Sequence, residues 1–365
     1  MPQLNNMRKY LIIVLSFCFS LAVSAENRKT FVEASELTLI GKVLANTPNP
    51  YHRLDTVQYK GFTKSENMQV RMSSGIAVAF RTDSPSISIK TVYGDVLWPN
   101  NTGGFSARGY DLYIRKDGRW LYAGAGVCDP KRPEKEMNIV ANMDKDLKEC
   151  LLYLPLYSEV QSVKIGVDEG ALLEPLQNPF GPKVAVFGSS YTQGSCTSRS
   201  GMTYLAQLSR TTGIEFLSLG CGGNCRLQSY FADALCDAQA DAFLFDTFSN
   251  SSPDQIRERL FPFIEKIQKA HPGKPLIFQR TIRRERRNFD KKVMAWEENR
   301  AFVADSMMNI ALKKYPDLYF ITPDATSDDH NATVDGVHPD NYGYTLWAES
   351  IKKQLLRILK KYRLY

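Results

Sequence analysis

Histidine is scarce in this chain, with only four among 365 residues. The sequence also has no CxxC cysteine pair, which disfavours zinc ribbons and thioredoxin-type redox sites. Nothing after residue 25 approaches the roughly 20 consecutive apolar residues that span a bilayer. No internal repeat and no nucleic-acid-binding motif occur, and a net charge of +7 is too small to indicate a nucleic-acid binder at this length.

The composition that is present is typical of a globular protein. Hydrophobic residues make up 43% and charged residues 23%, so a large core can be buried and collagen-like or low-complexity chains are excluded. At about 100–200 residues per domain, the length predicts two domains.

The first 25 residues have the pattern of a secretory signal peptide. Arg8 and Lys9 precede an apolar run over residues 10–23, which closes with small residues up to Ala25. We expect cleavage after Ala25 and export to the periplasm or the extracellular space. Cleavage would remove two cations and no acid, so the net charge would fall from +7 to +5. An oxidising compartment permits disulfides without fixing their pairing among the six cysteines that remain, namely Cys128, Cys150, Cys196, Cys221, Cys225 and Cys236.

Residues 26–171 predict an all-β sandwich domain of the jelly-roll type. Apolar residues alternate with a period of two in short runs that turn residues separate. These runs cover residues 68–72, 76–80, 87–91, 110–114, 120–122, 151–154 and 163–167.

The pattern changes after residues 172–183, which contain three prolines and are predicted to be a linker. In residues 184–365, short apolar runs alternate with helical patterns, one of which begins at Ser252 as N-cap. This alternation predicts an α/β domain with a doubly wound, flavodoxin-like parallel sheet. Its five strands are expected at 184–187, 214–219, 242–245, 276–279 and 318–321.

Polar motifs follow these strands at their carboxyl ends, where ligands bind in open α/β sheets. The glycine-flanked segment 188–194 contains Ser190, and Gly223 follows the second strand. Asn250 follows the third strand, and residues 335–339, DGVHP, follow the fifth. These pieces predict acyl transfer. Ser190 is the expected nucleophile, His338 the general base and Asp335 its orienting acid, with the N–H groups of Ser190 and Gly223 and the Asn250 amide as oxyanion donors.

The same residues resemble the conserved blocks of the SGNH hydrolases, the GDSL-type serine esterases. Segment 188–194 looks like their GDSL block, Gly223 and Asn250 match the second and third blocks, and residues 335–339 match the last. Residues 109–113, GYDLY, resemble the GxDLY signature of the β-sandwich that precedes some of these esterases. The resemblance implies a secreted esterase that removes short acyl groups, acetyl foremost, from a carbohydrate.

Two departures from the family pattern leave alternatives open. Ser189 stands where the family has Asp, and Phe248-Ser249-Asn250 replaces its Gly-x-Asn-Asp. An acyltransferase would use the same residues with an alcohol in place of water, and a non-catalytic glycan-binding protein would carry a decayed site. No motif requires a cofactor or a metal, although residues 328–330 with Asp335 and His338 could also be read as a metal cluster. The basic run 280–287 and the aromatic residues Tyr93 and Trp98 could contact a glycan, but a solvated loop and core packing explain them more simply. We expect no nucleic-acid partner, and the sequence leaves the oligomeric state open.

Overall fold

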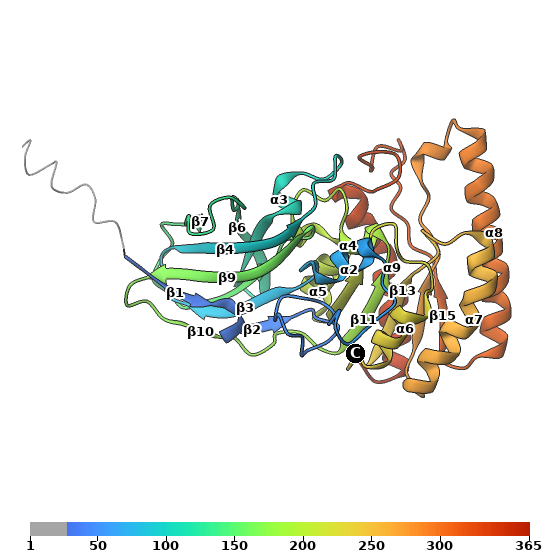
Figure 1. The fold of residues 1–365 in the computed structure, drawn as a ribbon, viewed down its shortest axis with the longest axis horizontal. Helices are drawn as coiled ribbons and strands as arrows, with labels where there is room; N and C mark the ends of the chain where they lie inside the picture. The colour runs from blue at the N-terminus through green and yellow to red at the C-terminus, as the bar shows by residue number, and fades with distance from the viewer. Residues whose placement is uncertain (1–27) are drawn as a thin grey trace, which may run out of the picture.

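The computed structural model describes residues 28–365, so the predicted signal peptide at residues 1–25 lies outside the described residues. Figure 1 shows two packed antiparallel sheets at one end of the molecule and a helix-covered parallel sheet at the other. The chain passes from the antiparallel half to the parallel half once, between β10 (Leu173–Pro175) and β11 (Lys183–Gly188). No helix in this described range is long and apolar enough to cross a bilayer.

The antiparallel half is a sandwich of two sheets. One sheet has the order β1-β9-β4-β7, and the other has the order β10-β3-β8-β5-β6, with β2 also paired to β3. Ile76, Phe80, Ile89 and Leu152 are fully buried in the core of this sandwich, as the period-two pattern predicts. The remaining strands are β1 (Lys29–Glu33), β2 (Thr38–Ile40), β3 (Ala77–Thr82), β4 (Ile87–Val96), β5 (Gly109–Lys116), β6 (Arg119–Val127), β7 (Met137–Val140), β8 (Lys148–Tyr153) and β9 (Ser158–Asp168).

Two predictions for this half are wrong in detail. Residues 68–72 are not a strand, because helix α2 (Lys64–Arg71) covers most of them. Thr63 and Glu66 form a capping box at the start of α2, and this sequence signature overrides a short alternation of apolar residues. The predicted linker 172–183 is also partly structured, since β10 extends the sandwich by pairing with β3.

The parallel half confirms the predicted flavodoxin-like fold. Its sheet has the order β12-β11-β13-β14-β15, with every pair parallel. Buried residues of α6, α7 and α8 share one core with one face of the sheet, and buried residues of α5 and α9 share a second core with the other face. The strands are β11, β12 (Glu215–Gly220), β13 (Ala242–Asp246), β14 (Leu276–Gln279) and β15 (Leu318–Ile321). The helices are α4 (Ser190–Gln193), α5 (Tyr204–Thr212), α6 (Ser229–Cys236), α7 (Pro253–Ala270), α8 (Lys291–Lys314) and α9 (Asn341–Lys361), besides α3 (Gly104–Ala107) in the sandwich.

The order of the strands fixes where a ligand can bind. β11 lies between β12 and β13, so the sheet grows from β11 in both directions, with β12 on one side and β13 on the other. At such a point the loops beyond the carboxyl ends of the strands diverge and leave a crevice. The segment that contains Ser190 begins at the carboxyl end of β11, which places it at this crevice.

Candidate active site

Ser190 is the first residue of α4, directly after β11. The Ser189 hydroxyl accepts the N–H of Tyr191 and caps this short helix. Gly188 allows the strand to turn sharply into the helix, because a Cβ at that position would lie 2.0 Å from the Thr192 hydroxyl oxygen. This local geometry presents the side chain of Ser190 at the edge of the sheet.

Asp335 and His338 lie on one tight turn between β15 and α9. Asp335 Oδ1 accepts the backbone N–H groups of Val337 and His338, at 2.9 and 2.7 Å. Gly336 adopts a φ of +75°, which favours glycine. Thr333 closes the turn by donating its hydroxyl to the carbonyl oxygen of His338, at 2.8 Å.

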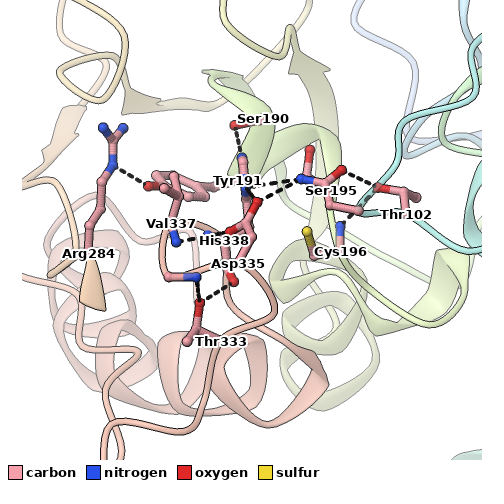
Figure 2. Close-up of polar contacts among 12 residues, drawn as sticks. Thr102, Ser190, Tyr191, Ser195, Cys196, Arg284, Thr333, Asp335, Val337 and His338 are labelled. Carbon is pink, nitrogen blue, oxygen red and sulfur yellow. Dashed lines mark hydrogen bonds and ion pairs between the residues drawn. The ribbon is translucent and has the colours of Figure 1, made fainter. Parts of the chain in front are cut away.

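The structure joins the three residues into one chain of hydrogen bonds (Figure 2). Ser190 Oγ lies 2.9 Å from His338 Nε2, and His338 Nδ1 lies 2.8 Å from Asp335 Oδ2. Partial burial opposes ionisation of Asp335, but hydrogen bonds from His338 and from Asn101 outweigh it and hold the pKa of Asp335 well below its usual range. An ionised Asp335 favours the imidazole tautomer with its proton on Nδ1, which leaves Nε2 free to accept the proton of Ser190.

The partner of Asp335 that sequence reasoning missed is Asn101. Its Nδ2 donates to Asp335 Oδ2 at 2.8 Å and lies 3.5 Å from His338 Nδ1. Asn101 belongs to the loop between β4 and α3 of the sandwich and is 234 positions away from Asp335 in the sequence. The sandwich therefore contributes a side chain to the site.

Asn101→Ala is expected to reduce kcat/KM for ester hydrolysis by about tenfold. A hydrogen bond to a charged group is worth about 1.5–3 kcal/mol, and the partial exposure of Asp335 favours the lower value. The exposed neighbour Asn100 gives the matched control, since Asn100→Ala should leave kcat/KM unchanged. Steady-state kinetics with equal losses in both variants, or with none in Asn101→Ala, would contradict this role.

The predicted oxyanion donors lie on loops beside Ser190. A Cβ on Gly222 would lie 3.4 Å from Ser190 Cβ, which places the turn that contains Gly223 next to the hydroxyl. Asn250 accepts the N–H of Cys225 through Oδ1, at 3.4 Å, and this leaves its amide N–H groups available. The backbone N–H groups of Ser190 and Gly223 donate no hydrogen bond within residues 28–365.

Helix α2 of the sandwich also contacts the turn at residues 220–224, which we call the glycine turn. Gln69 donates to the carbonyl oxygen of Gly222 at 2.8 Å and accepts the amide of Asn224 at 2.7 Å. Arg53, whose side chain is fully buried, donates to the carbonyl oxygens of Met72 and Gly220, each at 2.8 Å. These contacts fix the turn relative to Ser190, and no local sequence motif predicts them.

Comparisons with known proteins match both halves of the chain. The model of the GDSL-like lipase/acylhydrolase family matches residues 182–356, and the model for the N-terminus of SGNH-hydrolase-type esterases, GxDLY, matches residues 29–173. A solved structure from Bacteroides ovatus, described as a GDSL-like lipase, is 37% identical, with a TM-score of 0.88, over 91% of this chain and 98% of that one. The chain belongs to the GDSL-like lipase/acylhydrolase family. It is therefore a carboxylic ester hydrolase with an acyl-ester substrate.

More distant structures share the fold of this GDSL-like hydrolase across both halves. A salicylyl-acyltransferase from a tetracycline biosynthetic pathway is 19% identical, with a TM-score of 0.69, over 92% of this chain and 98% of that one. A family two carbohydrate esterase from Cellvibrio japonicus is 11% identical, with a TM-score of 0.59, over 91% of this chain and 98% of that one. No curated protein gives a significant match.

The GxDLY motif of this GDSL-like hydrolase connects its two halves. Asp111 accepts Arg199 Nη1 through both carboxylate oxygens, at 2.9 and 2.8 Å, and also accepts the N–H of Gly201 at 2.8 Å. Tyr113 of the same motif accepts Arg199 Nη1 at 2.6 Å. The motif therefore anchors the segment that follows the Ser190 helix.

Asp246, at the end of β13, contacts the altered GDSL block of this hydrolase. Its Oδ2 accepts the Ser189 N–H at 3.1 Å, the Ser189 hydroxyl at 2.6 Å and the Thr192 hydroxyl at 3.2 Å, and its Oδ1 accepts the Ser249 hydroxyl at 2.8 Å. Complete burial raises the pKa of Asp246, and the donated hydrogen bonds oppose that rise. One buried carboxyl group thus ties the Ser190 turn to the loop that carries Asn250.

Asp246→Ala is expected to lower the free energy of unfolding by about 3 kcal/mol or more, because the buried donors on Ser189, Thr192 and Ser249 would lose their acceptor. Asp246→Asn should cost much less. The amide oxygen can accept the Ser189 and Thr192 donors, and the Ser249 hydroxyl can rotate to accept the new amide N–H. Urea unfolding followed by circular dichroism separates the two variants, and equal losses in both would count against this role.

Other sequence hypotheses have clear structural outcomes. The metal cluster over residues 328–330 does not form in the described chain, because Asp329 bonds within its own loop and His330 pairs with Glu285. The basic run 280–287 is partly buried, with Arg284 donating to Tyr191 and to the carbonyl oxygen of Ser249. In the described residues all six cysteines are free thiols.

The two aromatic residues singled out in the sandwich differ in exposure. Tyr93 is half-buried and donates its hydroxyl to the carbonyl oxygen of Arg108. Trp98 is 61% exposed, and the Arg108 guanidinium lies 4.0 Å from its ring centroid. Trp98 therefore lies on the surface of the loop that carries Asn101, whereas the expectation of core packing applies to Tyr93.

Proposed function

We propose that this protein is an exported serine esterase that removes short acyl groups, acetyl foremost, from carbohydrate. The observation that carries the proposal is the continuous chain from Ser190 Oγ through the imidazole of His338 to Asp335. A nucleophile, a base and an orienting acid within hydrogen-bonding distance form the arrangement that acyl transfer requires.

In the first half-reaction, Ser190 Oγ attacks the ester carbonyl carbon and its proton moves to His338 Nε2. The carbonyl oxygen becomes an oxyanion and accepts hydrogen bonds from the N–H groups of Ser190 and Gly223 and from the Asn250 amide. The C–O bond to the alcohol then breaks, and His338 gives the proton to the leaving oxygen. Water attacks the acyl-enzyme, loses its proton to His338 and releases the acid, after which Ser190 regains its proton.

Three observations support the carbohydrate substrate and the export. The sandwich and the catalytic half occur together in the family two carbohydrate esterases that share this fold. The sandwich reaches the site through Asn101, close to the exposed ring of Trp98, and exposed aromatic rings suit contact with sugar faces. Residues 1–25 have the order of charged, apolar and small residues that directs export.

Acetate release tests the substrate. The chain without residues 1–25 is incubated with p-nitrophenyl acetate, with p-nitrophenyl butyrate and with acetylated xylo- and gluco-oligosaccharides, beside the Ser190→Ala variant. We expect Ser190-dependent release of acetate from the oligosaccharides and a lower rate with the butyrate. Hydrolysis of the nitrophenyl esters without any release from the oligosaccharides would reject a carbohydrate substrate and leave the serine esterase.

The likeness to a salicylyl-acyltransferase makes transfer to an alcohol the second candidate. The two activities share the acyl-enzyme and differ in what attacks it. Adding a sugar alcohol in excess and quantifying free acetate and acetylated alcohol by mass spectrometry separates them. A hydrolase gives mainly free acetate, and a transferase gives mainly the acetylated alcohol.

A further inference from the structure

Cys196 lies beside the catalytic residues without a role in the mechanism above. Each of Cys196, Asp335 and His338 has a potential metal-ligand atom that lies within 4.8 Å of those of the other two residues. Figure 2 shows the Cys196 sulfur close to Asp335 and His338. No other group of three potential metal ligands of this kind occurs in the described residues.

Backbone conformation and hydrogen bonds hold the segment that carries the Cys196 thiol. Cys196 adopts a φ of +69°, which is uncommon for a residue with a Cβ. Its N–H donates to the Thr102 hydroxyl at 3.3 Å, and the preceding residue, Ser195, is held on both sides by Ser190 and Tyr344. The thiol is free and buried, and burial together with the nearby Asp335 carboxylate raises its pKa, so a metal ion must displace the thiol proton to bind.

Thiolate, imidazole and carboxylate are the ligands that Zn²⁺ prefers in proteins. Bond lengths of about 2.3 Å to sulfur and about 2.0–2.2 Å to nitrogen or oxygen put the ligand atoms of a tetrahedral site roughly 3.5 Å apart. The three ligand atoms already lie within 4.8 Å of one another, and reaching that spacing opens the 2.8 Å hydrogen bond between His338 Nδ1 and Asp335 Oδ2. Three protein ligands leave a fourth position for water, whereas Mg²⁺ and Ca²⁺ prefer all-oxygen sites and suit this set poorly.

We propose that Cys196, Asp335 and His338 form an inhibitory Zn²⁺ site. Binding forms bonds from the metal to Cys196 Sγ, His338 Nδ1 and Asp335, and the thiol proton passes to solvent. The imidazole keeps its single proton, which moves from Nδ1 to Nε2. His338 can then no longer accept the proton of Ser190, so the bound ion stops acyl transfer. The inhibition rests on the proposed function, but the binding does not.

Zinc titration with two readouts tests the site. Competition with a chromophoric zinc chelator gives the affinity and stoichiometry, and the rate of p-nitrophenyl acetate hydrolysis gives the inhibition. We expect one Zn²⁺ per chain, inhibition with a constant equal to the measured Kd, and no inhibition by Mg²⁺. Co²⁺ should bind with a sulfur-to-metal charge-transfer band in the near ultraviolet.

Cys196→Ala is expected to keep its basal hydrolysis and to lose at least about tenfold in zinc affinity, since even changes outside the ligand sphere cost 10–100-fold. It should also lose the charge-transfer band. Cys196→Ser, which is closer in size, should behave in the same way and guards against a packing defect. Cys236→Ala, on α6, is the matched control and should bind zinc as the unchanged chain does.

The outcomes separate the zinc site from the esterase. Equal zinc affinity in the Cys196 variants and the unchanged chain would overturn the site, as would hydrolysis unaffected by zinc at saturating concentration. Stoichiometric, Cys196-dependent binding in a protein that hydrolyses no ester would leave the site standing and reject the proposed function.

Discussion

Ser190→Ala is expected to lower kcat for ester hydrolysis by about 10⁴-fold or more, because the acyl-enzyme cannot form without the hydroxyl. The loss should appear in kcat with little change in thermal stability, since among residues 28–365 the only side-chain partner of Ser190 Oγ is His338. Burst kinetics with p-nitrophenyl acetate measure the acyl-enzyme directly, and the burst should disappear in this variant.

Ser189 provides the matched control for that experiment. Its hydroxyl caps α4 and donates to Asp246, so Ser189→Ala should cost about 1–3 kcal/mol of stability while the burst remains. A larger loss of turnover in Ser189→Ala than in Ser190→Ala would show that Ser189, and not Ser190, is the nucleophile.

Asp335→Asn is expected to lower kcat by about 10³–10⁴-fold. An amide whose oxygen keeps the backbone contacts of Oδ1 places its N–H groups at the Oδ2 position, where the Asn101 contact is lost. It then offers an N–H to His338 Nδ1 and favours the tautomer with its proton on Nε2, which cannot accept the proton of Ser190. The backbone contacts that Asp335 Oδ1 makes can persist with an amide oxygen, so the turn should keep its shape.

Measuring kcat across pH distinguishes this effect from a general loss of structure. The Asp335→Asn rate should rise as the pH increases, because hydroxide can replace the missing base, whereas a misfolded protein would stay inactive at every pH. Asp328→Asn, in the exposed loop nearby, is the control and should retain full activity. If Asp335→Asn kept more than about a tenth of the activity, Asp335 would not be the orienting acid.

The sequence predicted the parts of the site that lie in short motifs at strand ends. Ser190, Asp335 and His338 could be identified because parallel strands bring their carboxyl ends to one edge, which the order of elements alone implies. The scarcity of histidine narrowed the choice of base to His338. The structure brings these residues into hydrogen-bonding distance, and their catalytic roles remain predictions that the variants above test.

The contacts that cross from one half to the other could not be predicted in this way. Asn101 is far from Asp335 in the sequence and lies in a polar loop that resembles any surface turn. Arg53 has no motif around it, although it is completely buried and donates to the carbonyl oxygen of Gly220. The sequence did contain a signal for Asp246 that was overlooked. Asp246 directly follows the apolar run 242–245, and a carboxylate buried there costs free energy unless other groups donate hydrogen bonds to it.

The missed helix α2 shows how local signals compete. Residues 68–72 alternate between apolar and polar side chains over a span too short to outweigh the capping box at Thr63 and Glu66. Gln69 lies on α2 and donates to the carbonyl oxygen of Gly222. Because the helix was not predicted, this contact with the glycine turn was not predicted either.

The ion pair between Asp111 and Arg199 and the hydrogen bond from Arg53 to Gly220 also bear on how such an enzyme can evolve. Appended binding modules on a flexible tether can be exchanged between genes without harm to catalysis. Here, recombination between the sandwich and the parallel sheet would leave the buried Asp111 carboxylate without Arg199 and remove one acceptor of the buried Arg53 guanidinium, which is destabilising. We therefore expect a change of substrate to be more accessible through the sandwich loops than through replacement of the whole sandwich.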